Sequence, residues 1–342
     1  MLKAFISGCA GTELLPAEDD FFAAEQPWGL ILFRRNCVDR EQIRGLVRSF
    51  RAAVGRDDAP ILIDQEGGRV QRLRPPGWPA YPAARSLGLL AERDAEAGER
   101  AAWLQGRLIA ADLNELGITV DCLPVLDVIV SGVSEAIGDR SFGSDPELVA
   151  TLGRAVADGL LAGGVLPVMK HMPGHGRATA DSHLSLPVVD AHGEVLERTD
   201  FVPFARLRDL PAAMTGHVVL SAVDPAHPAT TSPTIIRDII RGRISFDGLL
   251  MSDDVSMNAL TGDYGDRARA IHGAGCDLVL HCSGRIEEMR AIAAATPELV
   301  GKAGERAERA LAALPLPQRF DRDGGRTELL ALAGRVGWQP PA

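Results

Sequence analysis

Eight short apolar runs alternate with segments of helical periodicity along most of the 342-residue chain, and this rhythm restricts the possible folds more than any other feature. The runs are almost continuously apolar, which is typical of strands that are covered on both faces of a parallel sheet. A strand–helix repeat of this kind predicts an α/β protein with helices packed around the sheet. The predicted strands are residues 2–7, 29–33, 60–64, 119–123, 166–170, 212–217, 248–253 and 277–281.

The segments between the runs carry signals of helix starts. Asp39 is the predicted N-cap of a helix over residues 39–54, with Gln42 at the N3 position. Asp145 and Ser232 each precede a proline, which puts a capping side chain next to a residue suited to the first helical turn. Further helices are predicted over residues 101–116 and 286–295.

Parallel strands with intervening helices favour a (β/α)8 TIM barrel, and a doubly wound open sheet is the competing fold. No linker rich in Pro, Gly or Ser divides the chain, so we expect one catalytic barrel domain over residues 1–313. Residues 314–342 are expected to form a C-terminal appendage that packs on the barrel or extends from it.

Charge and cysteine content narrow the function classes. The formal net charge is −10 without a basic run, so we expect no nucleic-acid partner. The five cysteines are widely spaced and form no CxxC pair, which favours a reducing compartment and argues against a structural zinc site. The segment before Cys9 resembles a lipoprotein cleavage site but is too short for a signal peptide. No apolar run is long enough to span a bilayer, and we expect a cytoplasmic monomer without a membrane partner.

Polar residues stand where several predicted strands end. In a (β/α)8 barrel the active site lies at the carboxyl ends of the strands and in the loops that follow. These side chains should therefore gather around one rim and form a polar pocket. The polar strand ends are Asp64, Lys170 with His171, His217, Asp253 and His281.

Asp253 is the first candidate for catalysis. A carboxylate at the end of an apolar strand is unfavourable unless it is paired, hydrogen-bonded or used in chemistry. Capping of the next helix is the competing explanation, and it fits the neighbouring Asp254 at least as well. At a barrel strand end we favour a catalytic role for Asp253, in which it attacks the anomeric carbon of a sugar and forms a glycosyl-enzyme intermediate.

Such a reaction needs a proton donor for the leaving group. His183 is the best local candidate, because an unperturbed pKa of about 6.5 lets an imidazole act as acid and then as base near neutrality. In an extended segment Asp181 projects to the same side, where it can hold one imidazole nitrogen as the third member of a catalytic triad does. A solvated loop histidine beside an aspartate explains the same spacing equally well.

The run KHMPGHG at residues 170–176 combines polar side chains with turn formers. Its glycines allow tight turns and a close approach of the backbone to a ligand, and its proline stiffens the loop. Lys170 and His171 are expected to donate hydrogen bonds to sugar hydroxyls. His175 is expected to make a structural hydrogen bond within the turn.

Two arginines complete the candidate site. Arg72 closes the run DQEGGRVQR, and Arg140 lies in IGDRSFG. A surface charge is the usual role of an arginine. In a glycine-bearing loop near a barrel rim, however, the planar guanidinium is well suited to bind a ligand.

In this order, the motifs resemble those of bacterial β-N-acetylhexosaminidases of glycoside hydrolase family 3, the single-domain type that recycles cell-wall fragments. The resemblance extends from about residue 11 to about residue 284. Two positions depart from the usual pattern: Met172 stands where the family usually has Phe, and Gly216 where Ala is common. The matching runs are ILFRRN (31–36), IDQEGGRVQR (63–72), LPVLDV (123–128), IGDRSFG (137–143), KHMPGHG (170–176), DSH (181–183), MTGHV (214–218) and MSDDVSM (251–257).

The resemblance implies a retaining exo-β-N-acetylglucosaminidase that works without a metal or any other cofactor. It makes Asp253 the nucleophile, His183 the acid/base and Asp181 the residue that orients His183. The implied substrate is a small amino-sugar fragment of peptidoglycan, N-acetylglucosamine linked to 1,6-anhydro-N-acetylmuramic acid, with or without peptide. The residues implied to bind the terminal sugar are Asp64, Arg72, Arg140, Lys170 and His171.

Three other functions fit parts of the pattern. A class I aldolase would use Lys170 as its Schiff-base lysine. A metal-dependent hydrolase would take ligands from His171, His175, Asp181 and His183. A sugar-binding protein without turnover would keep only the pocket, although the intact catalytic motifs argue against it.

Overall fold

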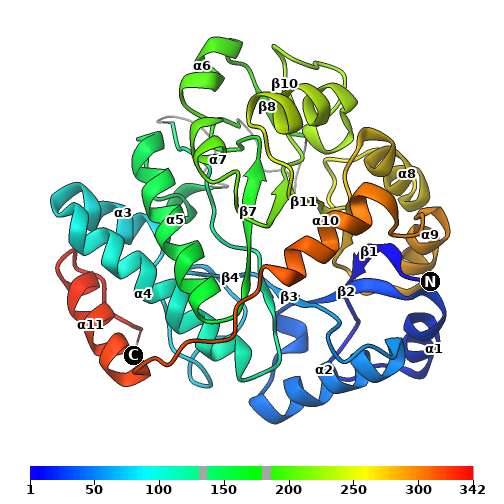
Figure 1. Ribbon diagram of the computed structural model, residues 1–342, viewed down its shortest axis with the longest axis horizontal. Helices are drawn as coiled ribbons and strands as arrows, with labels where there is room; N and C mark the ends of the chain where they lie inside the picture. The colour runs from blue at the N-terminus through cyan, green and yellow to red at the C-terminus, as the bar shows by residue number, and fades with distance from the viewer. Residues whose placement is uncertain (131–136, 179–185, 342) are drawn as a thin grey trace.

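The computed structural model, which describes residues 1–130, 137–178 and 186–341, contains a closed barrel of parallel strands (Figure 1). Within these residues each of the eight predicted apolar runs forms one barrel strand, so the (β/α)8 prediction is confirmed and the open sheet is wrong. The strands follow one another around the barrel in chain order, and the last pairs with the first. They are β1 (Lys3–Ser7), β2 (Pro27–Leu32), β3 (Ile61–Ile63), β6 (Val120–Asp121), β7 (Leu166–Met172), β9 (Ala212–Thr215), β11 (Leu249–Asp254) and β12 (Leu278–His281).

Apolar side chains are buried on both faces of the barrel strands, which explains why apolar and polar residues do not alternate along them. Along β1, Ile6 belongs to the cluster inside the barrel, whereas Phe5 packs in the outer layer beneath the helices. On β12, Leu278 and Leu280 lie inside and Val279 lies outside. Because both faces are buried, every position favours an apolar residue, and polar residues collect only where the strands end.

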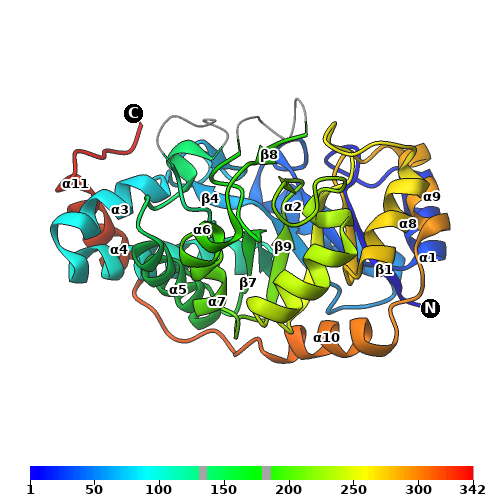
Figure 2. The ribbon, with the colours of Figure 1, turned by 90° about the horizontal axis from the view of Figure 1, so that it is seen from above.

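Helices surround the barrel and connect successive strands (Figures 1 and 2). The helices with α geometry are α1 (Pro16–Glu25), α2 (Arg40–Val54), α3 (Ala84–Arg93), α4 (Ala95–Asn114), α5 (Pro146–Ala162), α6 (Gly193–Arg198), α7 (Val202–Arg206), α8 (Tyr264–Ala274), α9 (Ile286–Ala295), α10 (Gly301–Ala312) and α11 (Arg322–Gly334). Short 3-10 turns are η1 (Arg34–Asn36), η2 (Gly138–Arg140) and η3 (Ala229–Thr231), and η4 (Ile235–Arg243) is a π-helix.

The predicted caps are in place. Asp39 Oδ1 accepts a hydrogen bond of 2.9 Å from the backbone N–H of Gln42 at the start of α2. Asp145 accepts one of 2.9 Å from the second residue of α5. Ser232 Oγ accepts one of 3.0 Å from Ile235, although the helix that follows has π-type hydrogen bonding. These side chains satisfy amide donors that the first turn of a helix leaves unpaired.

Two small sheets add to the predicted elements, and their strands of two or three residues are too short for a periodicity argument. The strands β4 (Gln65–Gly67) and β5 (Val70–Gln71) form an antiparallel hairpin directly after β3. The hairpin holds the DQEGGR run beside the carboxyl end of the barrel. The strands β8 (Val188–Val189) and β10 (Val219–Leu220), which follow β7 and β9, pair in parallel.

The helix α10 covers the amino end of the barrel, at the lower edge of the view in Figure 2. Its residues Ala307 and Ala310 pack in the same cluster as inward-facing barrel residues such as Leu278. Beyond it, α11 packs against α4 and α3. The division of the chain into a barrel and an appendage at residue 313 stays a prediction.

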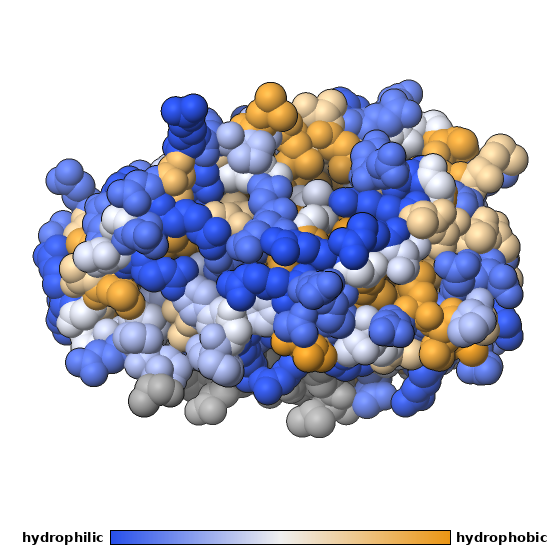
Figure 3. Space-filling view, turned by 90° about the horizontal axis from the view of Figure 1, so that it is seen from below, coloured by the Kyte–Doolittle hydropathy of each residue, from blue (hydrophilic) through white to orange (hydrophobic). Residues whose placement is uncertain are grey.

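The surface is mixed in character. Figure 3 shows one flank, where hydrophilic side chains predominate and hydrophobic ones occur in separate groups. Exposed large hydrophobic residues such as Val38 and Leu316 are far apart in the sequence. In the described parts of the chain, no helix has both the length and the apolarity that crossing a bilayer requires.

Candidate active site

A cavity of about 230 Å³ opens at the carboxyl ends of the barrel strands. A (β/α)8 fold places its chemistry at this end. Apolar side chains such as Phe33 and Met257 share its walls with charged groups, a composition suited to a polar ligand that has an apolar face. The acidic, basic and histidine residues that line it are Asp64, Glu66, Arg69, Arg72, Arg140, Lys170, His171, His175, Asp253 and Asp254.

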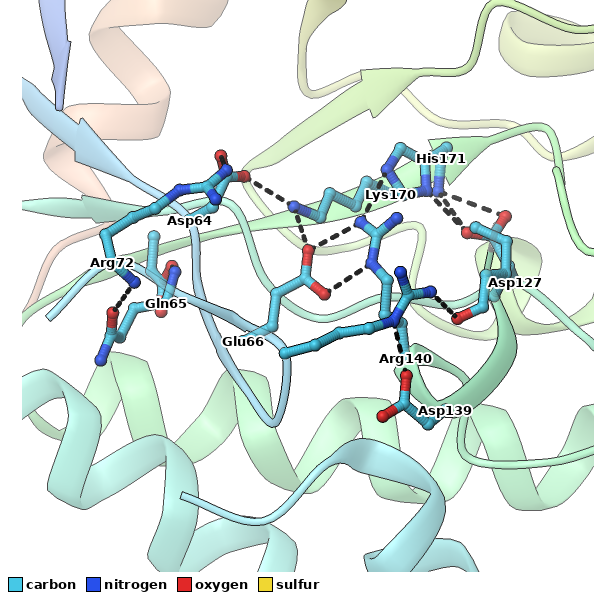
Figure 4. Close-up of polar contacts among 12 residues, drawn as sticks. Asp64, Gln65, Glu66, Arg72, Asp127, Asp139, Arg140, Lys170 and His171 are labelled. Carbon is cyan, nitrogen blue, oxygen red and sulfur yellow. Dashed lines mark hydrogen bonds and ion pairs between the residues drawn. The ribbon is translucent and has the colours of Figure 1, made fainter. Parts of the chain in front are cut away.

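A chain of ion pairs crosses one wall of this cavity (Figure 4). Lys170, in β7, places its Nζ atom 2.8 Å from Asp64 Oδ1 and 2.7 Å from Glu66 Oε1. Only 2% of the Lys170 side chain is exposed. Its charge is therefore balanced by two carboxylates and not by water, which is the condition under which a buried lysine stays charged.

Two arginines extend the chain at its ends. Arg72 Nη2 lies 2.8 Å from Asp64 Oδ2, and the guanidinium lies 4.9 Å from the centroid of the Phe33 ring. Arg140 binds Glu66 through two nitrogens, each 2.8 Å from a carboxylate oxygen. The structure thus brings both predicted arginines to the predicted strand-end residues.

Pairing keeps the members of this chain charged. Burial alone would raise the pKa of Asp64, but the Lys170 ammonium and the Arg72 guanidinium hold that pKa well below its usual range. Burial also opposes the ionisation of Glu66, yet Arg140 and Lys170 lower its pKa to about 2. Burial would lower the pKa of Lys170, but the two carboxylates raise it. A lysine held protonated in this way does not attack a carbonyl carbon, so the aldolase alternative gains no support from the geometry.

Asp253 lies at the carboxyl end of β11 and lines the cavity. Its Oδ1 atom accepts a hydrogen bond of 2.7 Å from the backbone N–H of Asp254. Burial would raise the pKa of Asp253, but His217, the Asp254 N–H and the Lys170 ammonium are among the groups that lower it. The carboxyl group is therefore ionised, as a nucleophile that attacks an anomeric carbon must be.

His217 and Asp254 shape the backbone around Asp253. His217 Nε2 lies 2.9 Å from the carbonyl oxygen of Asp254, so this nitrogen carries the donated proton. The Asp254 carboxylate accepts hydrogen bonds from Ser256 and from the backbone N–H of Cys282. Asp254 therefore stabilises the turn after β11, which agrees with a structural role for this second aspartate.

His171 and His175 are held by a buried carboxylate, that of Asp127. Asp127 Oδ2 lies 2.6 Å from His171 Nδ1, and Asp127 Oδ1 accepts a hydrogen bond of 2.7 Å from the His175 backbone N–H. His171 Nε2 lies 3.3 Å from Arg140 Nη2, which joins the imidazole to the ion-pair chain. Among the described residues, neither ring nitrogen of His175 has a hydrogen-bond partner, and burial lowers the pKa of His175 to about 4. The expected hydrogen bond of His175 is thus made by its backbone and not by its side chain.

Two residues of the site, Glu66 and Asp127, are absent from the predicted set. Glu66 stands two positions after Asp64, and such residues project to the same side of an extended chain, a signal that could have found it. Asp127 stands beyond the end of β6, after an irregular segment that hides its relation to the rim. His281, a predicted rim residue, does not line the cavity but is buried with its Nε2 atom 3.1 Å from Glu288.

Asp181 and His183, the predicted acid/base pair, lie outside the described residues. Their roles therefore stay predictions. Among the residues that are described, no group of three or more potential metal ligands occurs. The metal-hydrolase alternative also needs Asp181 and His183 as ligands, so it stays untested.

Sequence comparisons place the chain among known proteins. The model of the glycosyl hydrolase family 3 N-terminal domain matches residues 17–313. A β-hexosaminidase from Methylococcus capsulatus is 39% identical over 317 residues, which are 92% of this chain and 92% of that protein. A β-hexosaminidase from Aromatoleum aromaticum is 43% identical over 260 residues, which are 75% of this chain and 72% of that protein.

Solved structures agree with the sequence comparison. NagZ from Neisseria gonorrhoeae, in complex with N-trifluoroacetyl-D-glucosamine, has a TM-score of 0.85 and 31% identity, and the match covers 98% of both chains. A glycoside hydrolase family 3 β-N-acetylglucosaminidase from Paenibacillus sp. str. FPU-7 has a TM-score of 0.84 and 30% identity, and the match covers 96% of this chain and 66% of that one. The chain therefore belongs to glycosyl hydrolase family 3 and is an enzyme of its hexosaminidase type.

Proposed function

We propose that the protein is a retaining exo-β-N-acetylglucosaminidase that removes N-acetylglucosamine from the non-reducing end of peptidoglycan fragments. The observation that carries this proposal is the ionised carboxylate of Asp253 in a cavity that the Lys170 ion-pair chain also lines. A carboxylate nucleophile beside a dense set of polar binding groups is the arrangement that retaining glycosidases use.

In the first step, a carboxylate oxygen of Asp253 forms a bond to the anomeric carbon of the terminal sugar. Oδ1 is already engaged by the Asp254 N–H, which leaves Oδ2 available for the attack. The bond from the anomeric carbon to the leaving oxygen breaks at the same time, and its electron pair goes to that oxygen. His183 supplies the proton that this oxygen takes up.

In the second step, water attacks the anomeric carbon of the glycosyl-aspartate ester. His183, now neutral, accepts the proton of this water, and the Asp253 carboxylate leaves as the anion it was at the start. The pair of inversions retains the β configuration. Asp181 holds the imidazole of His183 and stabilises its protonated form. The roles of these two residues rest on the DSH motif.

The charged wall is suited to the hydroxyl groups of the terminal sugar. Asp64 accepts hydrogen bonds, while Lys170, Arg72 and Arg140 donate them. Hydrogen bonds to ionised groups are stronger than those between neutral groups, which favours a fixed orientation of the ring. We include His171 in this binding set, next to Arg140.

The choice of an N-acetylated sugar is supported by the relatives. The Neisseria gonorrhoeae structure contains N-trifluoroacetyl-D-glucosamine, a close analogue of N-acetylglucosamine. We extend this preference to the present chain, with N-acetylglucosaminyl-1,6-anhydro-N-acetylmuramic acid, with or without peptide, as the substrate. All five cysteines are free thiols, which agrees with a cytoplasmic site of action.

The proposal is tested by trapping the intermediate. A 2-acetamido-2-deoxy-5-fluoro-glucosyl fluoride should accumulate on the enzyme, and mass spectrometry of its peptides should find the adduct on Asp253. An adduct on another residue, or none despite turnover, would contradict the covalent mechanism. Hydrolysis of a chromogenic β-N-acetylglucosaminide beside the matching β-glucoside, with the product anomer followed by NMR, tests substrate class and stereochemistry separately.

A further inference from the structure

We propose that Asp127 is a positioning residue that fixes the tautomer of His171, so that the Nε2 atom of this imidazole acts as a hydrogen-bond acceptor toward Arg140 and the sugar. The activity readout of this inference rests on the proposed function, whereas its spectroscopic readout does not. Asp127 lies in LPVLDV, a run to which the sequence assigns no chemistry.

The contacts of Asp127 join two loops of the site. Its carboxylate is completely buried and accepts from His171 Nδ1 at 2.6 Å and from the His175 backbone N–H at 2.7 Å. Its carbonyl oxygen accepts a hydrogen bond of 2.6 Å from Ser141 Oγ, next to Arg140 in the chain. The KHMPGHG turn and the IGDRSFG loop are thus both fastened to one residue.

The glycine at position 176 reinforces this connection. A Cβ atom at Gly176 would lie 2.0 Å from the carbonyl oxygen of Val128, so only glycine allows the turn to pack directly on the backbone that follows Asp127. The position of the turn relative to Asp127 is therefore set by backbone contact as well as by hydrogen bonds.

The partners of His171 determine where its proton lies. A guanidinium has no acceptor, so the contact of 3.3 Å between Arg140 Nη2 and His171 Nε2 is a hydrogen bond only when Nε2 is unprotonated. An ionised carboxylate has no donor, so the contact with Asp127 requires a proton on Nδ1. Burial would raise the pKa of Asp127, but His171 and the N–H of His175 help to lower it, which keeps the carboxylate ionised.

This assignment changes the expected role of His171. With its one proton directed at Asp127, the imidazole presents a lone pair to the cavity. It therefore accepts a hydrogen bond, from Arg140 or from a hydroxyl group of the sugar, and does not donate one. The wall then offers the sugar two kinds of group. Lys170, Arg72 and Arg140 donate hydrogen bonds, and His171 joins Asp64 as an acceptor for the hydroxyl groups.

The substitution Asp127→Asn tests the proposal. The backbone N–H of His175 cannot change, so the amide oxygen must face it, and the amide NH2 group must face His171 Nδ1. The proton of His171 then moves to Nε2, where it opposes the N–H groups of Arg140. We expect kcat/KM to fall on the order of 10–100-fold, as for other supporting hydrogen bonds around a site, with most of the change in KM because both displaced groups bind the sugar.

Long-range 1H–15N NMR correlations of the histidine rings measure the tautomer directly. In the wild-type enzyme we expect a protonated Nδ1 and an unprotonated Nε2 for His171. His217 is the internal reference, because its Nε2 faces a carbonyl oxygen and must be protonated. In Asp127→Asn the His171 signals should change to those of a protonated Nε2.

Asp277→Asn is the matched control, since Asp277 is another buried aspartate, at the opposite end of the barrel. It should leave the His171 signals unchanged and kcat/KM within about twofold. The proposal is overturned if wild-type His171 has a protonated Nε2, if Asp127→Asn keeps its kcat/KM, or if it loses activity without a change of tautomer. If Asp127→Asn does not fold, the wild-type spectrum decides. If the wild-type enzyme folds but shows no turnover, the proposed function is contradicted. The NMR spectrum of His171 still tests the tautomer in that case.

Discussion

Ion-pair networks lie at both ends of the barrel, and they differ in what covers them. At the carboxyl end, the chain through Lys170 lines the cavity. At the amino end, Asp277 precedes β12 and lies 2.8 Å from Arg241 and 3.0 Å from Arg306. Arg306 belongs to α10, which packs over this end and closes it.

Burial alone does not distinguish the two networks. The side chains of Glu66 and Asp277 are each 4% exposed. The amino-end groups, however, are satisfied by one another and by backbone: Arg241 also donates to the carbonyl oxygens of Phe246 and Gly248. A recess of about 520 Å³ is lined by Arg306 and Asp247 at this end. The side chain of Asp247 is 71% exposed, so this recess is open to solvent. Buried charge therefore indicates a functional site only where the same groups also line an enclosed cavity.

The largest expected effect is at the cavity. Asp253→Asn removes the proposed nucleophile and should lower kcat on the order of 10⁴-fold while the protein stays folded. Turnover of a chromogenic β-N-acetylglucosaminide measures the change, and circular dichroism checks the fold. A variant that keeps more than about a tenth of the activity would remove Asp253 from the mechanism.

Lys170→Met should damage both binding and stability. It leaves Asp64 and Glu66 as adjacent buried carboxylates without their shared cation, a change that typically costs about 3–5 kcal/mol of folding free energy. We also expect kcat/KM to fall on the order of 100-fold, since the wall loses its central donor. Denaturant unfolding and steady-state kinetics measure the two effects, and an unchanged KM would show that the chain does not bind the sugar.

Asp277→Asn should separate stability from activity. It removes the charge that two arginines share at the amino end, so we expect a loss of about 2–4 kcal/mol in unfolding free energy. Below the melting transition kcat/KM should stay within about twofold of the wild type. A large loss of activity in this variant would break the distinction between the two ends.

Acid should weaken the carboxyl-end network through Glu66. The folded-state pKa of Glu66 is lowered from 4.5 to about 2, so its ionised form contributes stability above pH 4.5. That contribution is lost progressively as the pH falls from 4.5 towards 2. Unfolding free energies measured across this range should decline less steeply for Glu66→Gln than for the wild type. Equal slopes would show that the pairing of Glu66 does not contribute to acid stability.

The smallest effect is expected from Gly216→Ala. A Cβ atom there would lie 3.2 Å from His171 Cβ and 3.6 Å from His175 Cδ2, a contact that a small shift relieves. We expect KM to change by no more than about threefold, because alanine is common at this position in the resembling family. Gly176→Ala, which places a Cβ atom against the backbone of Val128, is the contrasting variant and should lose most activity.

Sequence reasoning predicted the barrel because its signal is repeated. Continuous apolar runs such as residues 166–170 report burial on both faces, and eight of them in succession leave few alternative folds. The hairpin of β4 and β5 was beyond reach, because strands of two or three residues have no measurable periodicity. The sequence also did not predict that α10 covers the amino end of the barrel, because that position depends on the path of the chain after β12.

The candidate site was predictable residue by residue but not as a network. Strand-end position indicates Asp64, Lys170 and Asp253 without any knowledge of their partners. Which carboxylate shares which cation depends on three-dimensional proximity between loops, so the pairing of Glu66 with Lys170 and the contact of Asp127 with His171 required the structure. Ionisation follows from the same proximity, since pairing and not residue type sets the charge of a buried group.

The closed amino end has a consequence for how molecules enter and leave. In the described part of the molecule, α10 and the packed barrel interior leave the rim as the route to the cavity. On the proposed function, substrate and product share that route and the same sugar-binding wall, so we expect released N-acetylglucosamine to compete with the next fragment. A cavity whose inner end is closed by the packed barrel interior agrees with the proposed removal of a terminal sugar. On the proposed function, each turnover therefore releases the terminal sugar, and bonds within a longer chain are not cut.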